Sequence, residues 1–330
     1  MRPNAVHPQT RYHRPGSVGE ACDLLRELGP DGSVLAGGTD VLVDIKRGSS
    51  RPAHLVSLSA LEELKRIVLT GDDLRIGALV TPAALEASGE VPSARPELLD
   101  AVRVFGTPQV RNRATVGGNL CTAASCGDLA PILMALGAGV GIQGPDGRRD
   151  LSLADFFQDH RKTRLREGEI LVEIVVPVRA PGEGVAYDAF GLRAANFITV
   201  ASVAAALHMR DGLCRGARVA LGAVAPTPLL VPSAQERLLG SRLDEDRIRE
   251  ASLAARAATT GPGRSPRMSA TTPVPATWVW TSSPSFWRSA ATRAAVRTSR
   301  PASSGVWWSR RRSACRSFSM ASTRRQMPRE

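Results

Sequence analysis

The sequence predicts an α+β protein with a domain boundary near residue 180. Short β-like runs and helical patterns intermix before this boundary, whereas two long alternating segments, 198–209 and 217–224, follow it. Two glycine pairs, Gly37-Gly38 and Gly117-Gly118, each follow a β-like run in the first part. With 330 residues, the chain is long enough for two or three domains with ordinary cores.

The first segment is predicted to begin with a helix over residues 17–29. Ser17 is a suitable N-cap, and Glu20 three residues later completes a capping box. Gly29-Pro30 is typical of a helix end. The expected elements that follow are a strand at 33–36, an apolar run at 41–45, a strand at 54–58 and a helical turn at 61–64.

The middle segment mixes strands with short helices. Thr81 can cap a helix that has Pro82 at its first position. Apolar residues on one face of 128–136 predict another helix, and a linker containing Pro and Gly is expected at about 180–188. The other expected elements are strands at 74–78, 139–142, 170–176, 198–209 and 217–224, a turn at 144–147, and helices at 96–104, 151–157 and 243–257.

The glycine pairs lie in two motifs suited to hold phosphate, Ala36-Gly37-Gly38-Thr39-Asp40 and Thr115-Val116-Gly117-Gly118-Asn119. Glycine lets the backbone pass close to a ligand and adopt a positive φ. Threonine and asparagine side chains, together with freed backbone N–H groups, can bond anionic oxygens. An ordinary tight turn is the alternative for either pair alone, but the two together indicate a bound dinucleotide.

Composition excludes several classes of protein. No run of 18 apolar residues is present, which argues against a membrane span. The five cysteines form no CxxC pair, and their odd number fits a reducing cytoplasm better than a disulfide framework. Cys121 and Cys126 are too few to complete a metal cluster. We therefore expect a cytoplasmic protein without a metal site of its own.

The net charge of +12 is a property of the tail formed by residues 261–330. This tail contains 13 arginines, no lysine and a single acid, Glu330, so the preceding residues are neutral overall. A neutral body argues against a nucleic-acid-binding function. A protein that binds nucleic acid through the tail alone is kept as an alternative.

The tail also differs from the rest of the chain in composition. It holds all five tryptophans and 14 serines, but no leucine, isoleucine or aspartate. We interpret it as the translation of a shifted reading frame in a GC-rich gene, which yields an anomalous, disordered tail. A natural basic disordered arm is the alternative, and a membrane-surface segment would need an amphipathic stripe that is missing.

Several motifs occur in a fixed order: Tyr12-His13-Arg14-Pro15, Leu35–Asp40, Ile76-Gly77-Ala78, Gly106–Leu120 and Asp128-Leu129-Ala130-Pro131. Over about residues 8–260 they resemble the FAD-binding, medium-sized subunit of the molybdenum hydroxylases. That family includes xanthine dehydrogenase, carbon monoxide dehydrogenase and 4-hydroxybenzoyl-CoA reductase. Ordered agreement of this length is far more specific than one glycine motif.

The resemblance implies a fold. Two α/β subdomains of the FAD-binding PCMH or vanillyl-alcohol-oxidase type, 1–60 and 61–178, would hold FAD between them. A smaller C-terminal α/β domain at 186–260, like that of the CO dehydrogenase flavoprotein, would contain a three-stranded sheet and helices. The family has further helices where this chain has the tail 261–330, so an exposed apolar sheet face is expected.

The resemblance also implies the residues that contact FAD. The loop Val34–Val41 would wrap the pyrophosphate, and the second glycine motif would contact phosphate and ribityl. Phe105 and Leu171 would be apolar contacts, and Asp128 would lie on the cofactor, although capping the following helix is its alternative role. The full expected set is Val34, Leu35, Ala36, Gly37, Gly38, Thr39, Asp40, Val41, Phe105, Thr115, Gly117, Gly118, Asn119, Asp128 and Leu171.

The activity implied is that of an oxidoreductase subunit within a complex. A small [2Fe–2S] subunit and a large molybdopterin subunit would be its partners, as a dimer of heterotrimers, and electrons would leave FAD to an acceptor such as NAD, a quinone or oxygen. No catalytic residue is expected in this chain, because the flavin carries the redox chemistry. A free-standing flavin oxidase of the same fold is the alternative, but no candidate base stands out among the few His and Tyr residues.

Overall fold

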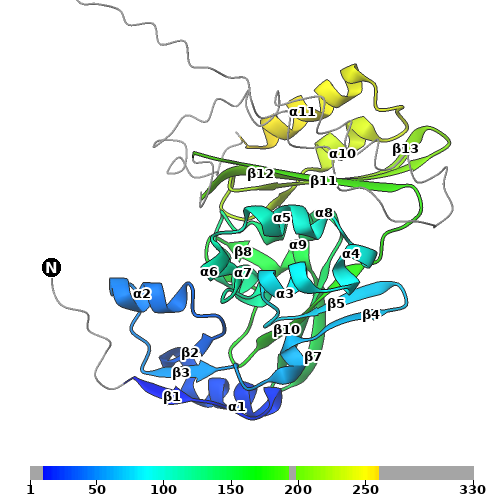
Figure 1. Cartoon of the computed structure of the whole chain (residues 1–330). Coiled ribbons are helices and arrows are strands. Elements are labelled where there is room, and N and C mark those ends of the chain that lie inside the picture. The colour runs from blue at the N-terminus through cyan, green and yellow to red at the C-terminus, as the bar shows by residue number, and fades with distance from the viewer. Residues whose placement is uncertain (1–9, 193–197, 260–330) are drawn as a thin grey trace, which may run out of the picture. The chain divides into compact units, whose positions relative to one another are not determined.

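The computed structural model describes residues 10–192 and 198–259, and its first part is a small parallel sheet with two helices (Figure 1). The strands β1 (Arg11–His13), β2 (Gly32–Leu35) and β3 (His54–Ser57) lie in the order β1-β3-β2, with both pairs parallel. Helix α1 (Val18–Leu28) and the 3-10 turn η1 (Gly29–Asp31) connect β1 to β2, and helix α2 (Val41–Arg47) connects β2 to β3.

Local sequence explains both helices. Ser17 caps α1 by accepting a hydrogen bond from the Glu20 amide at 3.1 Å, and the Glu20 carboxylate accepts one from the Gly16 amide at 2.7 Å. The predicted N-cap at Ser17 is therefore confirmed, but the Glu20 carboxylate bonds the Gly16 amide and not the Ser17 amide of a standard capping box. The apolar run at 41–45 is helical, and α2 ends at Gly48, whose φ of +77° closes the last turn.

The second part is a five-stranded antiparallel sheet in the order β4-β5-β10-β6-β7, covered by short helices. Its core includes Ile76, Leu133, Ile174 and Phe156, all fully buried. The strands are β4 (Ile67–Thr70), β5 (Asp73–Gly77), β6 (Gly139–Gly144), β7 (Gly147–Ser152) and β10 (Ile170–Pro177), with the small ribbon β8 (Phe157–Asp159) and β9 (Lys162–Thr163). The helical segments are η2 (Glu62–Lys65), α3 (Pro82–Ala87), α4 (Glu90–Ala94), α5 (Leu98–Val104), α6 (Pro108–Arg111), α7 (Val116–Thr122), α8 (Leu129–Ala135) and α9 (Leu153–Phe156).

Two expectations about the third part need correction. The segment expected as a linker at 180–188 largely belongs to strand β11 (Glu183–Gly191), because its apolar residues pair along β12 (Thr199–Arg210). The sheet has four strands, not three, in the order β11-β12-β13-β14, since the two-residue β14 (Leu229–Leu230) pairs with β13 (Leu213–Gly222).

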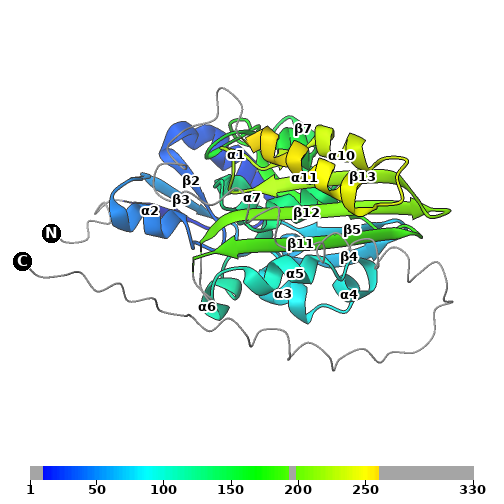
Figure 2. The ribbon, with the colours of Figure 1, turned by 90° about the horizontal axis from the view of Figure 1, so that it is seen from above.

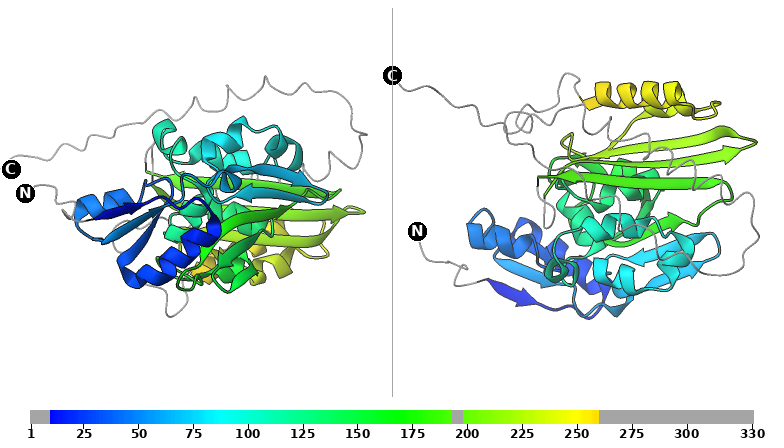
Figure 3. Two further views of the ribbon diagram at one scale, coloured as in Figure 1. Left: turned by 90° about the horizontal axis from the view of Figure 1, so that it is seen from below. Right: turned by 45° about the horizontal axis from the view of Figure 1, so that its top comes forward.

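This sheet is covered on both faces, as the alternation along β12 shows. Ala204 and Ala206 point into the core shared with the second part, whereas Val203, Ala205 and Leu207 belong to a separate core. Figures 2 and 3 show α11 (Glu245–Thr259) lying along the sheet on that second side, with α10 (Pro232–Leu238) beside it. The expected bare sheet face is therefore covered by helices within the described residues.

A buried ion pair joins the second and third parts of the chain. Arg95, 2% exposed, contacts the Glu183 carboxylate at 2.9 Å and donates to the carbonyl oxygen of Pro177. The predicted tail at 261–330 and its reading-frame hypothesis lie outside the described residues. Within the described residues, no helix is long and apolar enough to cross a bilayer.

Candidate functional site

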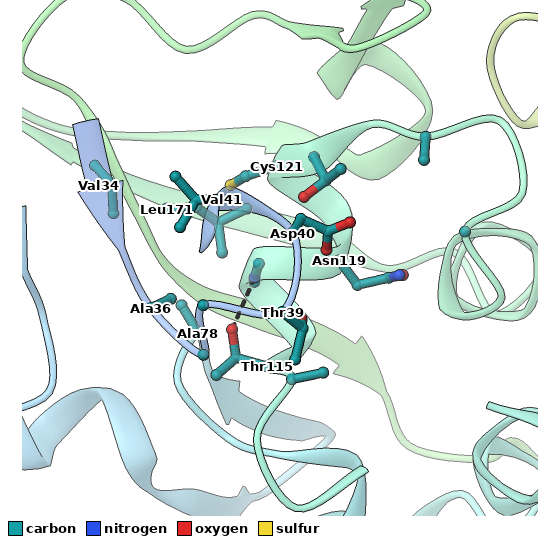
Figure 4. A pocket seen from close by; sticks show the side chains of 18 of the residues that line it. Val34, Ala36, Thr39, Asp40, Val41, Ala78, Thr115, Asn119, Cys121 and Leu171 are labelled. Atoms are coloured by element: carbon teal, nitrogen blue, oxygen red, sulfur yellow. Dashed lines mark hydrogen bonds between the residues drawn. The ribbon is translucent and has the colours of Figure 1, made fainter. Parts of the chain in front are cut away.

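A cavity of about 680 Å³ lies where the loop after β2, helix α7 and strand β10 meet. Its size is that of a site for a small molecule or cofactor. Figure 4 shows the loop that carries Thr39 and Asp40 crossing beside the helix that carries Thr115 and Asn119. Of the residues expected at the cofactor, these line the cavity: Val34, Ala36, Gly37, Gly38, Thr39, Asp40, Val41, Phe105, Thr115, Gly117, Gly118, Asn119, Asp128 and Leu171.

Leu35 is the expected residue that does not line the cavity. It alternates with Val34 along β2, and side chains of successive strand residues point to opposite faces. Its carbonyl oxygen accepts a hydrogen bond from the Leu58 amide at 3.0 Å, so it joins β2 to the chain after β3.

The first glycine pair brings the two subdomains into contact. A Cβ atom on Gly37 would overlap the carbonyl oxygen of Arg113 and lie 2.9 Å from its carbonyl carbon. Gly38 has a φ of +78°, which favours glycine. Among the described residues, the amides of Gly37, Gly38 and Thr39 have no hydrogen-bond acceptor. Successive unpaired N–H groups in a turn are the type of group from which proteins build anion sites.

The second glycine pair differs from the expectation, because it lies inside the first turn of α7 and not in a loop. The Gly117 amide donates to the Ala78 carbonyl at 2.9 Å, and the Gly118 amide donates to the Thr115 hydroxyl oxygen at 3.0 Å. These amides are therefore not free for a phosphate. Glycine is needed here for close packing, since a Cβ on Gly117 would lie 2.7 Å from the Cβ of Ala78.

Asn119 carries a buried acceptor atom at the cavity. Its Oδ1 atom is buried and has no hydrogen-bond partner in the described structure. Burying a carbonyl oxygen without a partner costs about 1–3 kcal/mol. Asn119 lines the cavity on the same helix as Thr115, so a donor on a bound molecule would satisfy it.

Asp128 does not fill one of the two roles expected of it, that of a helix cap. It precedes α8, but its side chain makes no capping hydrogen bond. Instead, the Thr199 hydroxyl at the start of β12 donates to its Oδ1 atom. Burial raises the pKa of Asp128 to about 6, although the Thr199 hydrogen bond acts in the opposite direction. Both residues line the cavity, so the third part of the chain contributes to its wall.

Apolar side chains form another part of the wall. Phe105 is 6% exposed and Leu171 is 3% exposed. Cys121 lies beside them on α7, and burial raises the pKa of its thiol to about 12. It is therefore a protonated, apolar wall residue at neutral pH. Within the described residues, no group of three or more His, Cys, Asp or Glu side chains is placed to hold a metal ion.

The charged groups of the cavity are mostly acidic. Asp40, Asp44, Asp128 and Glu169 line it, and Arg161 is the single base among the described lining residues. Glu169 is neutralised by Arg149 at 2.6 Å. Arg161 lies 2.7 Å from Asp44 and holds the pKa of that carboxyl below its usual range.

Several wall residues lie outside the set expected from the sequence. Ala78 and Leu79 follow β5 and pack under α7, and the motif Ile76-Gly77-Ala78 was a signal for them. Thr199 and Glu169 had no local signal, because they reach the cavity only through tertiary packing. The motif residue His13 does not line the cavity; its ring stacks on His54, with Nε2 2.8 Å from Nδ1 of that residue.

Comparison with known proteins shows which family the chain resembles. Residues 8–179 match the model of the FAD binding domain in molybdopterin dehydrogenase, and residues 186–271 match that of the CO dehydrogenase flavoprotein C-terminal domain. The chain is 35% identical over 250 residues to the carbon monoxide dehydrogenase medium chain of Hydrogenophaga pseudoflava, covering 76% of this chain and 87% of that protein. It is 34% identical over 228 residues to the xanthine dehydrogenase FAD-binding subunit of Escherichia coli O157:H7, covering 68% and 77%.

A solved structure agrees with these sequence matches. Carbon monoxide dehydrogenase from Hydrogenophaga pseudoflava, in a form that lacks the Mo-pyranopterin moiety of the cofactor, contains a similar chain with a TM-score of 0.79 and 32% identity. The alignment covers 88% of this chain and 98% of that one. The match therefore extends over both the FAD-binding domain and the C-terminal domain.

Proposed function

The chain belongs to the family of FAD-binding subunits of molybdenum hydroxylases, and we propose that it passes electrons from a partner's [2Fe–2S] clusters to an external acceptor. It binds FAD and is an oxidoreductase subunit, as its relatives are. The proposed partners are a small iron–sulfur subunit and a large molybdopterin subunit. Relatives named as medium chains support this arrangement.

The observation that carries the proposal is a cavity with unsatisfied polar groups where the two subdomains meet. The free amides at Gly37, Gly38 and Thr39 would bind the anionic pyrophosphate. The Asn119 carbonyl oxygen would accept a hydrogen bond from a hydroxyl of the cofactor. Residues present in the chain therefore fit FAD at both its charged and its neutral polar groups.

The remaining wall residues orient the cofactor. Phe105 and Leu171 provide apolar surface for a flavin ring and exclude water from it. The Thr115 hydroxyl accepts from Gly118, and its hydrogen stays available to donate to a phosphate oxygen. When bound, FAD supplies the redox chemistry. The protein's part is to bind, orient and shield the cofactor.

Reconstitution tests the proposal. The full chain, mixed with FAD, should become yellow and retain flavin through gel filtration. In the complex with both partners, an oxidisable substrate of the large subunit should bleach the flavin, and NAD, a quinone or oxygen should restore its colour. Flavin bleached by substrate in the absence of partners would contradict the electron-transfer role and favour a free-standing oxidase.

A further inference from the structure

Arg161 occupies a backbone position that an arginine rarely adopts. It lies in the turn between β8 and β9 with a φ of +56°, in the left-handed region that favours glycine and asparagine. Its amide donates to the carbonyl oxygen of Ala123, the C-cap of α7, at 2.9 Å. Residues kept in such conformations often serve a function that offsets the strain.

The side chain of Arg161 connects this turn to the first subdomain. Its Nη1 atom donates to Oδ2 of Asp44 at 2.7 Å, across 117 residues of sequence. Asp44 lies on α2, and the Ser49 hydroxyl also donates to its carboxylate at 3.3 Å. Both partners of the ion pair line the cavity.

Helix α2 needs a connection of this kind, because it contributes no buried residue to any core. Leu42 and Val43 on this helix are 48% and 40% exposed. The loop with the free amides leads directly into α2, and the Leu42 amide donates to the Gly38 carbonyl at 3.2 Å. The position of α2 therefore sets the position of the loop.

We propose that Arg161 is a positioning residue for FAD, which acts through Asp44 to hold α2, and with it the loop Gly37–Asp40, against the second subdomain. This inference rests on the proposed function, in which the cavity holds FAD. Arg161 would then slow the release of FAD without contacting it. The alternative is a direct contact between the guanidinium group and the FAD diphosphate, with Asp44 as a competitor for Arg161.

Release of FAD from the full chain distinguishes the two roles. The variants are Arg161→Asn, Asp44→Asn and the double variant, because asparagine tolerates the φ of residue 161 and is isosteric with aspartate. The control is Arg103→Asn. Arg103 pairs with Asp100 at 2.8 Å, and the two side chains are 51% and 23% exposed, close to the 49% and 21% of Arg161 and Asp44. Arg103 does not line the cavity. Flavin fluorescence after dilution reports release, and thermal unfolding of the apoprotein reports folding.

Positioning through Asp44 predicts that each single variant releases FAD up to about fivefold faster than wild type, the range of an exposed ion pair. The double variant should release FAD no faster than either single variant, because both remove the same contact. High salt should accelerate release from the wild type but not from Arg161→Asn. The apoprotein of Arg161→Asn should unfold close to the wild-type temperature, because relief at the positive φ offsets the loss of the exposed ion pair.

Three other outcomes would overturn the inference in distinguishable ways. Faster release from Arg161→Asn together with unchanged or slower release from Asp44→Asn would show a direct contact with FAD. Release from both variants at the rate of Arg103→Asn would show a surface ion pair without a role. A wild-type chain that takes up no FAD would refute the proposed function itself.

Discussion

Replacing Asp128 by asparagine should change how the stability of the apoprotein depends on pH. Asp128 is largely buried beside the cavity, and this burial raises its pKa to about 6 from an ordinary value of 3.8. Asparagine keeps an oxygen that can accept the hydrogen bond of the Thr199 hydroxyl, but it cannot ionise. The variant therefore removes the titration and retains the contact.

The direction of the effect follows from proton binding. Between about pH 4 and pH 6 the unfolded chain releases the proton of Asp128 while the folded chain retains it, so the wild type loses stability as the pH rises through this window. Above pH 6 the loss is complete. A difference of about two pKa units corresponds to about 3 kcal/mol. Asp128→Asn should therefore be more stable than the wild type by up to that amount at pH 7.5, but nearly equal to it at pH 4.

Urea unfolding of both apoproteins at half-unit steps from pH 4 to pH 7.5 measures this difference. Asp44→Asn is the matched comparison, because the pKa of Asp44 is lowered by Arg161. Removing that carboxylate should cost a similar amount of stability at every pH from 4 to 7.5, because a carboxyl whose pKa is lowered loses its contribution only below its ordinary value of 3.8. A difference between wild type and Asp128→Asn that stays constant with pH would refute the assignment of a raised pKa to Asp128.

Three further substitutions test the packing of the site and the domain junction. Gly37→Ala should lower the free energy of unfolding by about 1–3 kcal/mol and weaken FAD binding, because the new Cβ meets backbone atoms of Arg113. Gly89→Ala is the control, because the space around Gly89 is open. Asn119→Ala should leave the apoprotein as stable as the wild type or more stable, because it removes an unpaired acceptor, and FAD titration should show weaker binding. A loss of stability together with unchanged affinity for FAD would contradict a role of Asn119 in binding the cofactor. Arg95→Met should cost about 3–5 kcal/mol in urea unfolding, because Glu183 would remain buried without its cation, and an unchanged midpoint would argue against a buried pair.

Local sequence signals predicted the elements whose ends are marked by caps. The capping residues Ser17 and Thr81 and the apolar face of 128–136 placed α1, α3 and α8 within a few residues. Strand β11 was missed because its glycine and alanine residues carry little β-propensity, and its pairing with β12 determines its conformation. The second glycine motif was taken for a loop, although its N-cap, Thr115, was present in the sequence.

The candidate site was predictable where it is made of contiguous motifs. All residues of the two glycine motifs except Val116 line the cavity, whereas their contact with FAD stays a prediction. Contacts between distant segments were not predictable, since neither Thr199 nor Asp44 carries a local signal for its partner. Unpaired groups such as Asn119 Oδ1 also depend on burial, which a single sequence does not give.

The cavity wall extends along the chain from Ser33 to Thr199. A ribosome adds residues in order, so the segment that closes this wall is synthesised long after the loop that begins it. The nascent chain therefore has no complete cavity wall until the start of strand β12 has emerged. On the proposed function, we expect tight FAD binding to be a late event in biosynthesis, after the C-terminal sheet has begun to fold.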